Sequence, residues 1–292
     1  MEAEEHDRWV GRWYSERTPE PFIPLLRKGT ALVIDDAPGA DVGSIGSNNI
    51  LGWKTRGCVG VVTGATARDT DEIAAQKVPL SVLRDGSDGD ASDQVVKLLN
   101  HGVAPASIWD GLRAGAAELV LRQPGIVALH AVTTTNALHY AWCHSREDAT
   151  RRFVLLQNAA FLPMFREAMR GRGKVADRRI DGLQPRVSPD ARPGIEEILA
   201  EVSRDRMSAV GKVLAYLDSG GKSDALIDAA RRVLLVKGDD AHDYKFSGAV
   251  FEEFGTIAPA WRDRFLAVST LRLHGSQDRD NPLVRRVREA FA

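Results

Sequence analysis

The stretch RDGSDGDAS, residues 84–92, separates two kinds of sequence in this 292-residue chain. Glycine, aspartate and serine dominate the stretch, and clusters of these residues between periodic segments are typical of loops. Before it, short apolar runs alternate with glycine-rich turns, whereas after it apolar residues recur every three or four positions. We therefore predict an α/β plus all-α protein with a linker at residues 85–92.

The part before the linker follows the pattern of a small βαβ-type element. The runs ALVID (31–35) and CVGVV (58–62) are nearly continuous in apolar residues, which is typical of strands buried on both faces. We assign this element to residues 29–84, after an N-terminal segment at 1–28. An element of roughly 55 residues is near the lower limit for independent folding. We therefore expect either the helical domain or a second copy of the chain to cover it.

The part after the linker, residues 93–292, is predicted to be entirely helical. Its apolar spacing follows the helical period, and several prolines stand where a first helical turn would begin. The basic, proline-containing segment at 170–193 is predicted to be a connecting loop. We expect helices to begin near Ser92, Pro105, Gly125, Glu147, Pro193, Ser223, Asp240, Pro259 and Asn281.

Composition excludes several classes of function. Lys and Arg total 39 against 40 for Asp and Glu, so the net charge of -1 gives no general attraction to nucleic acid or to anionic membranes. The two cysteines, Cys58 and Cys143, lack the spacing of a disulfide framework or of a zinc-thiolate site. The acidic start, MEAEEHDRW, and the absence of an apolar run of ~20 residues predict a cytoplasmic protein without a membrane span.

An ordered set of motifs lies within residues 29–82. A strand ends in two aspartates at 35–36, the turn GSIGSNN follows at 43–49, and the strand RGCVGVV leads to a G-x-x-x-R-D corner at 64–69. In this order the motifs resemble the family of the regulator of RNase activity A and the divalent-metal aldolases for 4-hydroxy-4-methyl-2-oxoglutarate. The resemblance implies a partial swivelling-domain fragment of that family, which covers under a fifth of the chain.

The resemblance also implies a reaction and a site. In the family's enzymes the corner arginine holds the substrate carboxylate, and the adjacent aspartate helps to hold a divalent ion such as Mg²⁺ or Mn²⁺. By position these roles fall on Arg68 and Asp69, and the turn that presents amides to a 2-oxo acid would be Gly46, Ser47, Asn48 and Asn49. The implied function is a metal-dependent carbon–carbon lyase of aldolase or decarboxylase type. Family sites draw residues from a neighbouring subunit, so we expect a homo-oligomer.

Elementary chemistry fits this assignment, although a structural alternative stays open. Cleavage of a 2-oxo acid builds negative charge on an enolate, which a hard cation held by oxygen ligands can neutralise. The guanidinium of Arg68 offers a planar fork for a carboxylate. However, Asp69 followed three residues later by Glu72 also has the spacing of a helix capping box, which requires no metal.

A second candidate site lies in the helical domain, where PGIVALHAVTTTNALHYAWCHSRED (124–148) contains three histidines. His130 and His139 are nine positions apart, which places them on opposite faces of a continuous helix, so they cannot share an ion. A metal or cofactor site would therefore need ligands from other helices. The alternative helical site would combine His130 or His139 with donors from other helices, and the best of these donors are His242, Asp243, Glu118, Glu252 and Glu253.

His139 shares one face of its helix with Thr135, Asn136, Trp142 and Cys143. Such a stripe can line a cofactor cavity together with His242, or it can belong to hydrogen-bonded packing between helices. A third possibility is a protein without catalysis, in which the α/β element serves in partner binding or oligomerisation. The sequence leaves these alternatives open.

Overall fold

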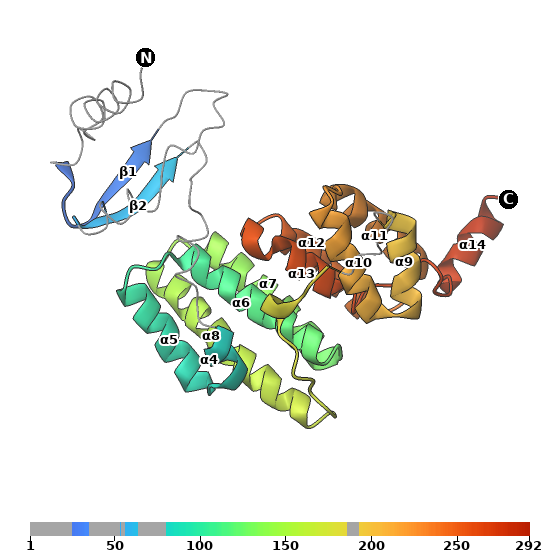
Figure 1. The fold of residues 1–292 in the computed structure, drawn as a ribbon, viewed down its shortest axis with the longest axis horizontal. Coiled ribbons are helices and arrows are strands. Elements are labelled where there is room, and N and C mark those ends of the chain that lie inside the picture. Colours follow the sequence, from blue (N-terminus) through green and yellow to red (C-terminus); the bar gives the residue numbers. More distant parts are fainter. Residues whose placement is uncertain (1–24, 35–52, 54–55, 64–79, 186–192) are drawn as a thin grey trace, which may run out of the picture. The chain divides into compact units, whose positions relative to one another are not determined.

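The computed structural model describes residues 25–34, 53, 56–63, 80–185 and 193–292. The chain divides into two compact units, residues 1–76 and 77–292 (Figure 1). The described residues are mostly helical, with a small two-stranded parallel sheet near the N-terminus. The two predicted strands and the larger helical part are confirmed, and the βαβ connection between the strands lies outside the described residues.

The sheet consists of β1 (Thr30–Ile34) and β2 (Cys58–Thr63). The two strands run parallel, and Ile34 at the end of β1 is paired with Thr63 at the end of β2. Gly57, in the turn immediately before the second strand, has a φ of +92°, and a Cβ on it would lie 2.6 Å from the Cα of Lys28. Glycine is therefore required at this turn, because only a residue without a side chain tolerates both the dihedral and the close approach.

Eleven α-helices follow within the described part of the second unit. Proline occupies the first turn of three of them, as the sequence predicts. Between α8 (Asp148–Arg170) and α9 (Ile195–Arg204), the described residues 171–185 contain only a short 3₁₀ helix, η3 (Ile180–Gly182), which confirms the connecting loop there. The helices are α4 (Leu80–Asp85), α5 (Asp88–Asn100), α6 (Pro105–Arg122), α7 (Ile126–His144), α8 (Asp148–Arg170), α9 (Ile195–Arg204), α10 (Arg206–Asp218), α11 (Ser223–Lys237), α12 (Ala241–Phe254), α13 (Pro259–Ser269) and α14 (Pro282–Ala290).

One predicted boundary is wrong, and one helix was not predicted. The linker expected at 85–92 lies largely in helical structure, because Ser87 and Asp90 form a reciprocal cap that begins α5. The Ser87 hydroxyl accepts the Asp90 N–H at 3.1 Å, and the Asp90 carboxylate accepts the Ser87 N–H at 2.8 Å. Helix α10 was not predicted; it begins directly after Asp205, whose carboxylate caps its first turn.

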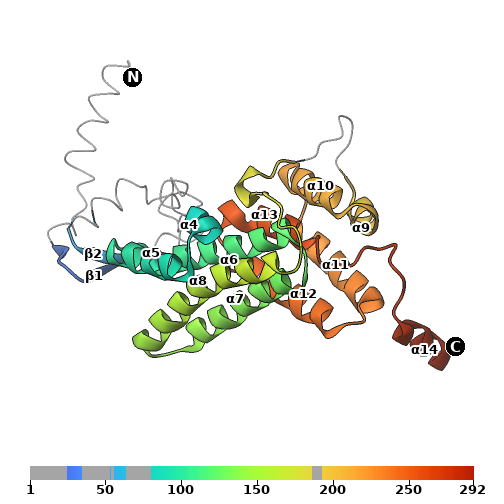
Figure 2. The same cartoon turned by 90° about the horizontal axis from the view of Figure 1, so that it is seen from below.

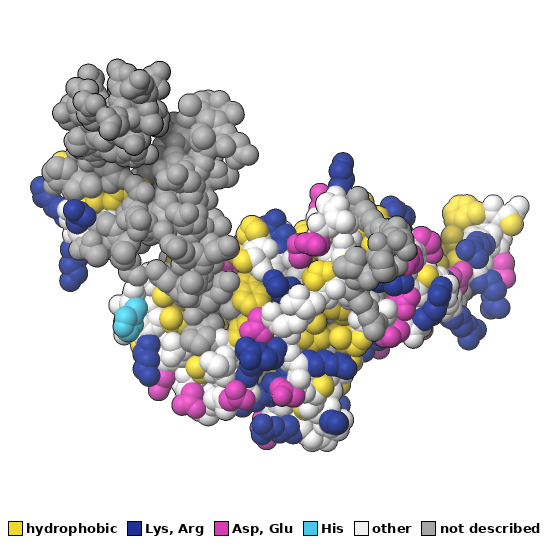
Figure 3. All heavy atoms as spheres, viewed as in Figure 1, with side chains coloured by type: hydrophobic (Ala, Val, Ile, Leu, Met, Phe, Trp, Pro, Cys, Tyr) yellow, Lys and Arg dark blue, Asp and Glu magenta, His cyan; other side chains and the backbone are white. Residues whose placement is uncertain are grey.

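Helix α6 forms the centre of the helical unit. It packs against α7, α8 and α13, and its buried face includes Trp109, Leu112 and Leu121 (Figure 2). On the face of this unit shown in Figure 3, acidic and basic side chains are interspersed over the surface. This distribution agrees with the near-zero net charge of the chain.

Candidate functional site

The predicted lyase residues follow the two strands in the sequence. Arg68, Asp69 and the turn residues Gly46, Ser47, Asn48 and Asn49 are outside the described residues. The strands that lead toward them are described, and their ends, Ile34 and Thr63, are paired in parallel. The chain therefore leaves both strands at the same edge of the sheet, which is where ligands bind in open α/β sheets.

In the helical unit, a buried polar cluster joins α6 and α12. The Arg113 and Glu253 side chains are 3% and 2% exposed and form an ion pair through Nε and Oε2. The remaining guanidinium nitrogens of Arg113 donate to Asp110 Oδ1 and to Thr256 Oγ1, each at 3.1 Å. A buried charge is tolerated only when it is paired and hydrogen-bonded, and this arrangement meets both conditions.

His139 of α7 completes this cluster. Arg113 Nη2 lies 2.9 Å from both ring nitrogens of His139, and Glu253 Oε1 lies 3.3 Å from Nδ1. The ring meets the edge of Trp109 and stacks on Trp142, with centroids 5.1 and 6.0 Å away. These contacts fit the structural alternative for His139, in which it is hydrogen-bonded between packed helices. The sequence reasoning missed Arg113, although a lone arginine in the apolar run LRAGAAELVL was a usable signal.

The pKa values of the two carboxylates in this cluster differ in the direction of their shifts. Burial by itself raises the pKa of Glu253, but the hydrogen bond with His139 and the charge of Arg113 outweigh it and keep that pKa below its usual value. Burial raises the pKa of Asp110 despite its contact with Arg113. The carboxylate of Glu253 therefore stays ionised as the partner of Arg113.

Cys143 lies one turn after His139, and its Sγ is 3.4 Å from Nε2 of that ring. This spacing is that of a nucleophile next to a base. However, burial raises the pKa of the Cys143 thiol, which disfavours the reactive thiolate. Nε2 of His139 also has a nearer donor in Arg113, at 2.9 Å. The pair therefore lacks the electrostatics of an activated cysteine.

The remaining predicted ligands fall into two other places. His130 and His242 face each other edge to face, with ring centroids 5.4 Å apart, and His242 Nδ1 lies 2.8 Å from Asp240. Asp243 caps the same end of α12, and its Oδ2 lies 2.9 Å from Nε2 of His274. Glu118 instead pairs with Arg84 at 2.5 Å and accepts the N–H of Ile180 at 3.0 Å.

The prediction that His139 and His242 face one cavity is wrong. His242 is in the first turn of α12, whereas the partner of His139 on that helix is Glu253. Eleven residues at 1.5 Å each separate these positions by roughly 16 Å along the axis. His139 and His242 therefore cannot bind one ion together.

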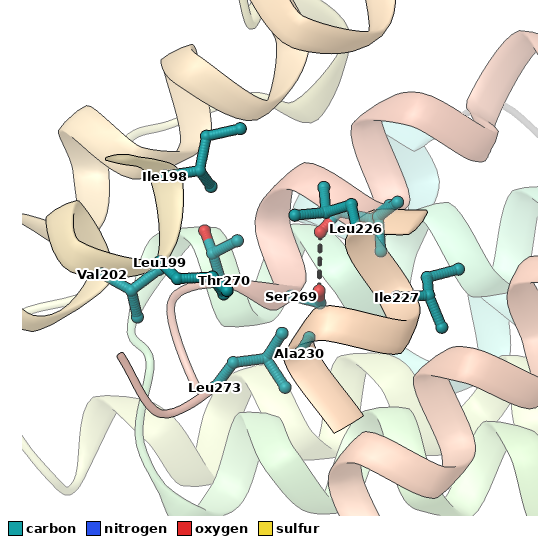
Figure 4. A pocket seen from close by; sticks show the side chains of 10 residues that line it. Ile198, Leu199, Val202, Leu226, Ile227, Ala230, Ser269, Thr270 and Leu273 are labelled. Atoms are coloured by element: carbon teal, nitrogen blue, oxygen red, sulfur yellow. Dashed lines mark hydrogen bonds between the residues drawn. The ribbon is translucent and has the colours of Figure 1, made fainter. Parts of the chain in front are cut away.

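The described residues provide no metal cluster. Among them, no group of three His, Cys, Asp or Glu side chains is placed to hold a metal ion. A cavity lined by Ile198, Leu226 and Leu273 (Figure 4) has a volume of only about 10 Å³ and is apolar. It is too small for a substrate and offers a water molecule few polar partners. None of the described helices is both long and apolar enough to cross a membrane.

Comparisons with known proteins found no relative. No protein-family model matches the chain, no curated protein matches it, and no solved structure matches it.

Proposed function

We propose that the chain is a divalent-metal-dependent lyase that cleaves a small 2-oxo acid, with its site beyond the strand ends of the N-terminal unit. The observation that supports this proposal is the parallel pairing of Ile34 with Thr63 at the ends of the two strands. Parallel strands that end together direct the segments after them to one edge of the sheet. Both the Gly46 turn and the Arg68 corner follow those strand ends in the sequence.

In this proposal each residue has a chemical task. The guanidinium of Arg68 binds a carboxylate of the substrate through paired hydrogen bonds and orients it. Backbone N–H groups of the turn at residues 46–49 donate to the oxygens on which negative charge develops. Asp69 offers the type of oxygen ligand that Mg²⁺ and Mn²⁺ prefer, and a bound ion would supply additional neutralisation of the enolate.

The helical unit supports the proposal by elimination of its main rival. Its best candidate, His139, has its ring nitrogens occupied by Arg113 and Glu253. The charged groups of that cluster already neutralise one another, so they are poorly suited to bind a substrate. The remaining histidine pair, His130 and His242, lacks a third ligand among the described residues.

The test is the release of pyruvate from oxaloacetate with and without Mg²⁺. Divalent ions alone promote this reaction, so the rate with metal and no protein must be subtracted. Arg68→Ala should lower kcat/KM roughly tenfold to hundredfold, since a charge-assisted hydrogen bond contributes about 1.5–3 kcal/mol. Arg68→Lys should recover only part of this loss, because a lysine cannot bind a carboxylate through a fork.

A matched control is Arg152→Ala, which removes an exposed arginine of α8 that pairs with Asp148. It should leave kcat/KM unchanged. Metal-independent turnover, or full activity of the Arg68→Ala protein, would refute the proposed reaction site.

A further inference from the structure

Helix α14 (Pro282–Ala290) is the one helix of the described chain without a buried side chain. Leu283, Val287 and, just beyond the helix, Phe291 are 59%, 46% and 89% exposed. They are spaced four residues apart, so they form one apolar stripe. A helix of nine residues is marginal in water by itself, and its stability normally comes from packing of an apolar face. A binding partner for this stripe would supply that packing.

The charges beside the stripe indicate the chemistry of the partner. At about 100° per residue, Arg286 and Arg288 lie on either side of the stripe. Arg285 adds a third cation, and Glu289 is the single acidic residue within the helix. Two copies of α14 facing each other would therefore place arginines against arginines, which is unfavourable. The partner surface should instead be acidic around a small apolar centre.

Helix α14 is fixed at its start and projects from there. The N–H of Asn281 donates to the Val236 carbonyl at 2.8 Å, and its side chain donates to the Leu235 and Gly238 carbonyls at 3.1 and 3.0 Å. The same side chain accepts the Val284 N–H and so caps α14. Apolar and basic side chains lie together on this projecting end (Figure 3).

A complementary surface lies between α4 and α5. An open groove of about 490 Å³ there is lined by Val82, three aspartates (Asp85, Asp90 and Asp93) and one lysine, Lys97. Val96 of α5 is also 41% exposed. Asp85 and Asp93 form no ion pair with any described residue, so their charges remain available.

The two surfaces cannot meet within one molecule. In both views, α14 lies at the opposite end of the helical unit from α4 and α5 (Figures 1 and 2). We propose that α14 of one copy binds the acidic groove between α4 and α5 of a second copy. Such contacts are head-to-tail, so they generate a ring where the rotation closes and a filament where it does not.

The test is a charge exchange, read by sedimentation velocity of the full-length protein. The unmodified chain should associate in a concentration-dependent and salt-sensitive way between about 1 and 100 μM. Arg286→Glu with Arg288→Glu should weaken association at least tenfold, and so should Asp85→Lys with Asp93→Lys. Neither pair should unfold the chain, because α14 buries no side chain and the aspartates line an open groove.

The decisive experiment asks whether association returns when the charges of both surfaces are reversed. A chain that carries all four substitutions should associate again, and an equimolar mixture of the two reversed proteins should form mixed assemblies. A matched control, Arg152→Glu with Arg170→Glu on α8, reverses two exposed arginines elsewhere and should leave association unchanged.

Three outcomes would overturn the proposal. The unmodified chain could be monomeric throughout this range, or both charge-reversed proteins could associate as strongly as the unmodified chain. It could also remain monomeric and bind phosphatidylserine vesicles through Arg286 and Arg288, which would identify α14 as a lipid-binding helix instead.

Discussion

The two units of this protein differ in how their described elements are buried. In the helical unit, thirteen of the eighteen residues of α6 are buried. In the sheet, Val33 and Val59 are 77% and 70% exposed, although both belong to apolar strands. Two strands by themselves are marginally stable in water. The helical unit therefore supplies its own stability, whereas the sheet depends on whatever covers its strands.

The difference extends to the polar groups. In the helical unit, two of the predicted site residues instead connect helices. His139 contacts Arg113, and Glu118 pairs with Arg84. These contacts indicate that the helical unit supplies stability, and our proposal places the chemistry in the N-terminal unit.

The largest expected effect is on the buried ion pair. Arg113→Met would leave the Glu253 carboxylate buried without its cation and should lower the free energy of unfolding by ~3–5 kcal/mol. Urea denaturation followed by circular dichroism measures this change. The double variant Arg113→Met with Glu253→Leu should recover much of the loss, because both charges are then absent. A small effect of the single variant would show that the pair is not structural.

The next effect compares the two units directly. Leu129 of α7 is 1% exposed, and Leu129→Ala should destabilise the protein by ~2–5 kcal/mol through the cavity that it leaves. Val33→Ala in β1 should change the free energy of unfolding by less than ~0.5 kcal/mol, since that side chain is already exposed. Equal effects of the two substitutions in thermal or urea unfolding would contradict the difference that we describe.

A smaller effect tests where the helical unit begins. Ser87→Ala removes the hydroxyl that caps α5 and should cost ~1 kcal/mol. Hydrogen exchange should become faster in the first turn of α5 and stay unchanged in α7. If residues 85–92 formed a flexible linker, this substitution would have no effect on exchange.

The pH dependence gives a further comparison, between Glu253 and its neutral analogue. The pKa of Glu253 is lowered in the folded protein, so its stabilising contribution is complete above the ordinary glutamate value of 4.5. It is lost as the pH falls through the lower, folded value. The stability difference between the unmodified protein and Glu253→Gln should therefore narrow from pH 5 to pH 3. A constant difference over this range would show that folding does not change the pKa of Glu253, and a widening difference would show that this group is protonated in the fold.

Local signals predicted much of the fold. Prolines at 105 and 259 stand at true helix starts, and Asp240 caps α12 as expected. The missed helix α10 follows α9 with only Asp205 between them, so no loop composition marks the break. Residues 85–92 were predicted as a linker because serine and aspartate, which cap a helix here, also occur often in turns and loops.

The buried cluster was harder to predict, for a physical reason. Arg113 and Glu253 are 140 positions apart, and only the packing of α6 against its neighbours brings them together. Periodicity places each residue on a face of its own helix but does not identify the opposite helix. The separation of His139 from His242 similarly depends on the packing of α7 along α12.

The most direct test of our account measures kcat/KM for Mg²⁺-dependent pyruvate release in two variants side by side, Arg68→Ala and His139→Gln. We predict a roughly tenfold to hundredfold loss in the first, where a substrate contact disappears, and little change in the second while it remains folded. The opposite result, with activity retained without Arg68 and lost without His139, would contradict the assignment of chemistry to the N-terminal unit.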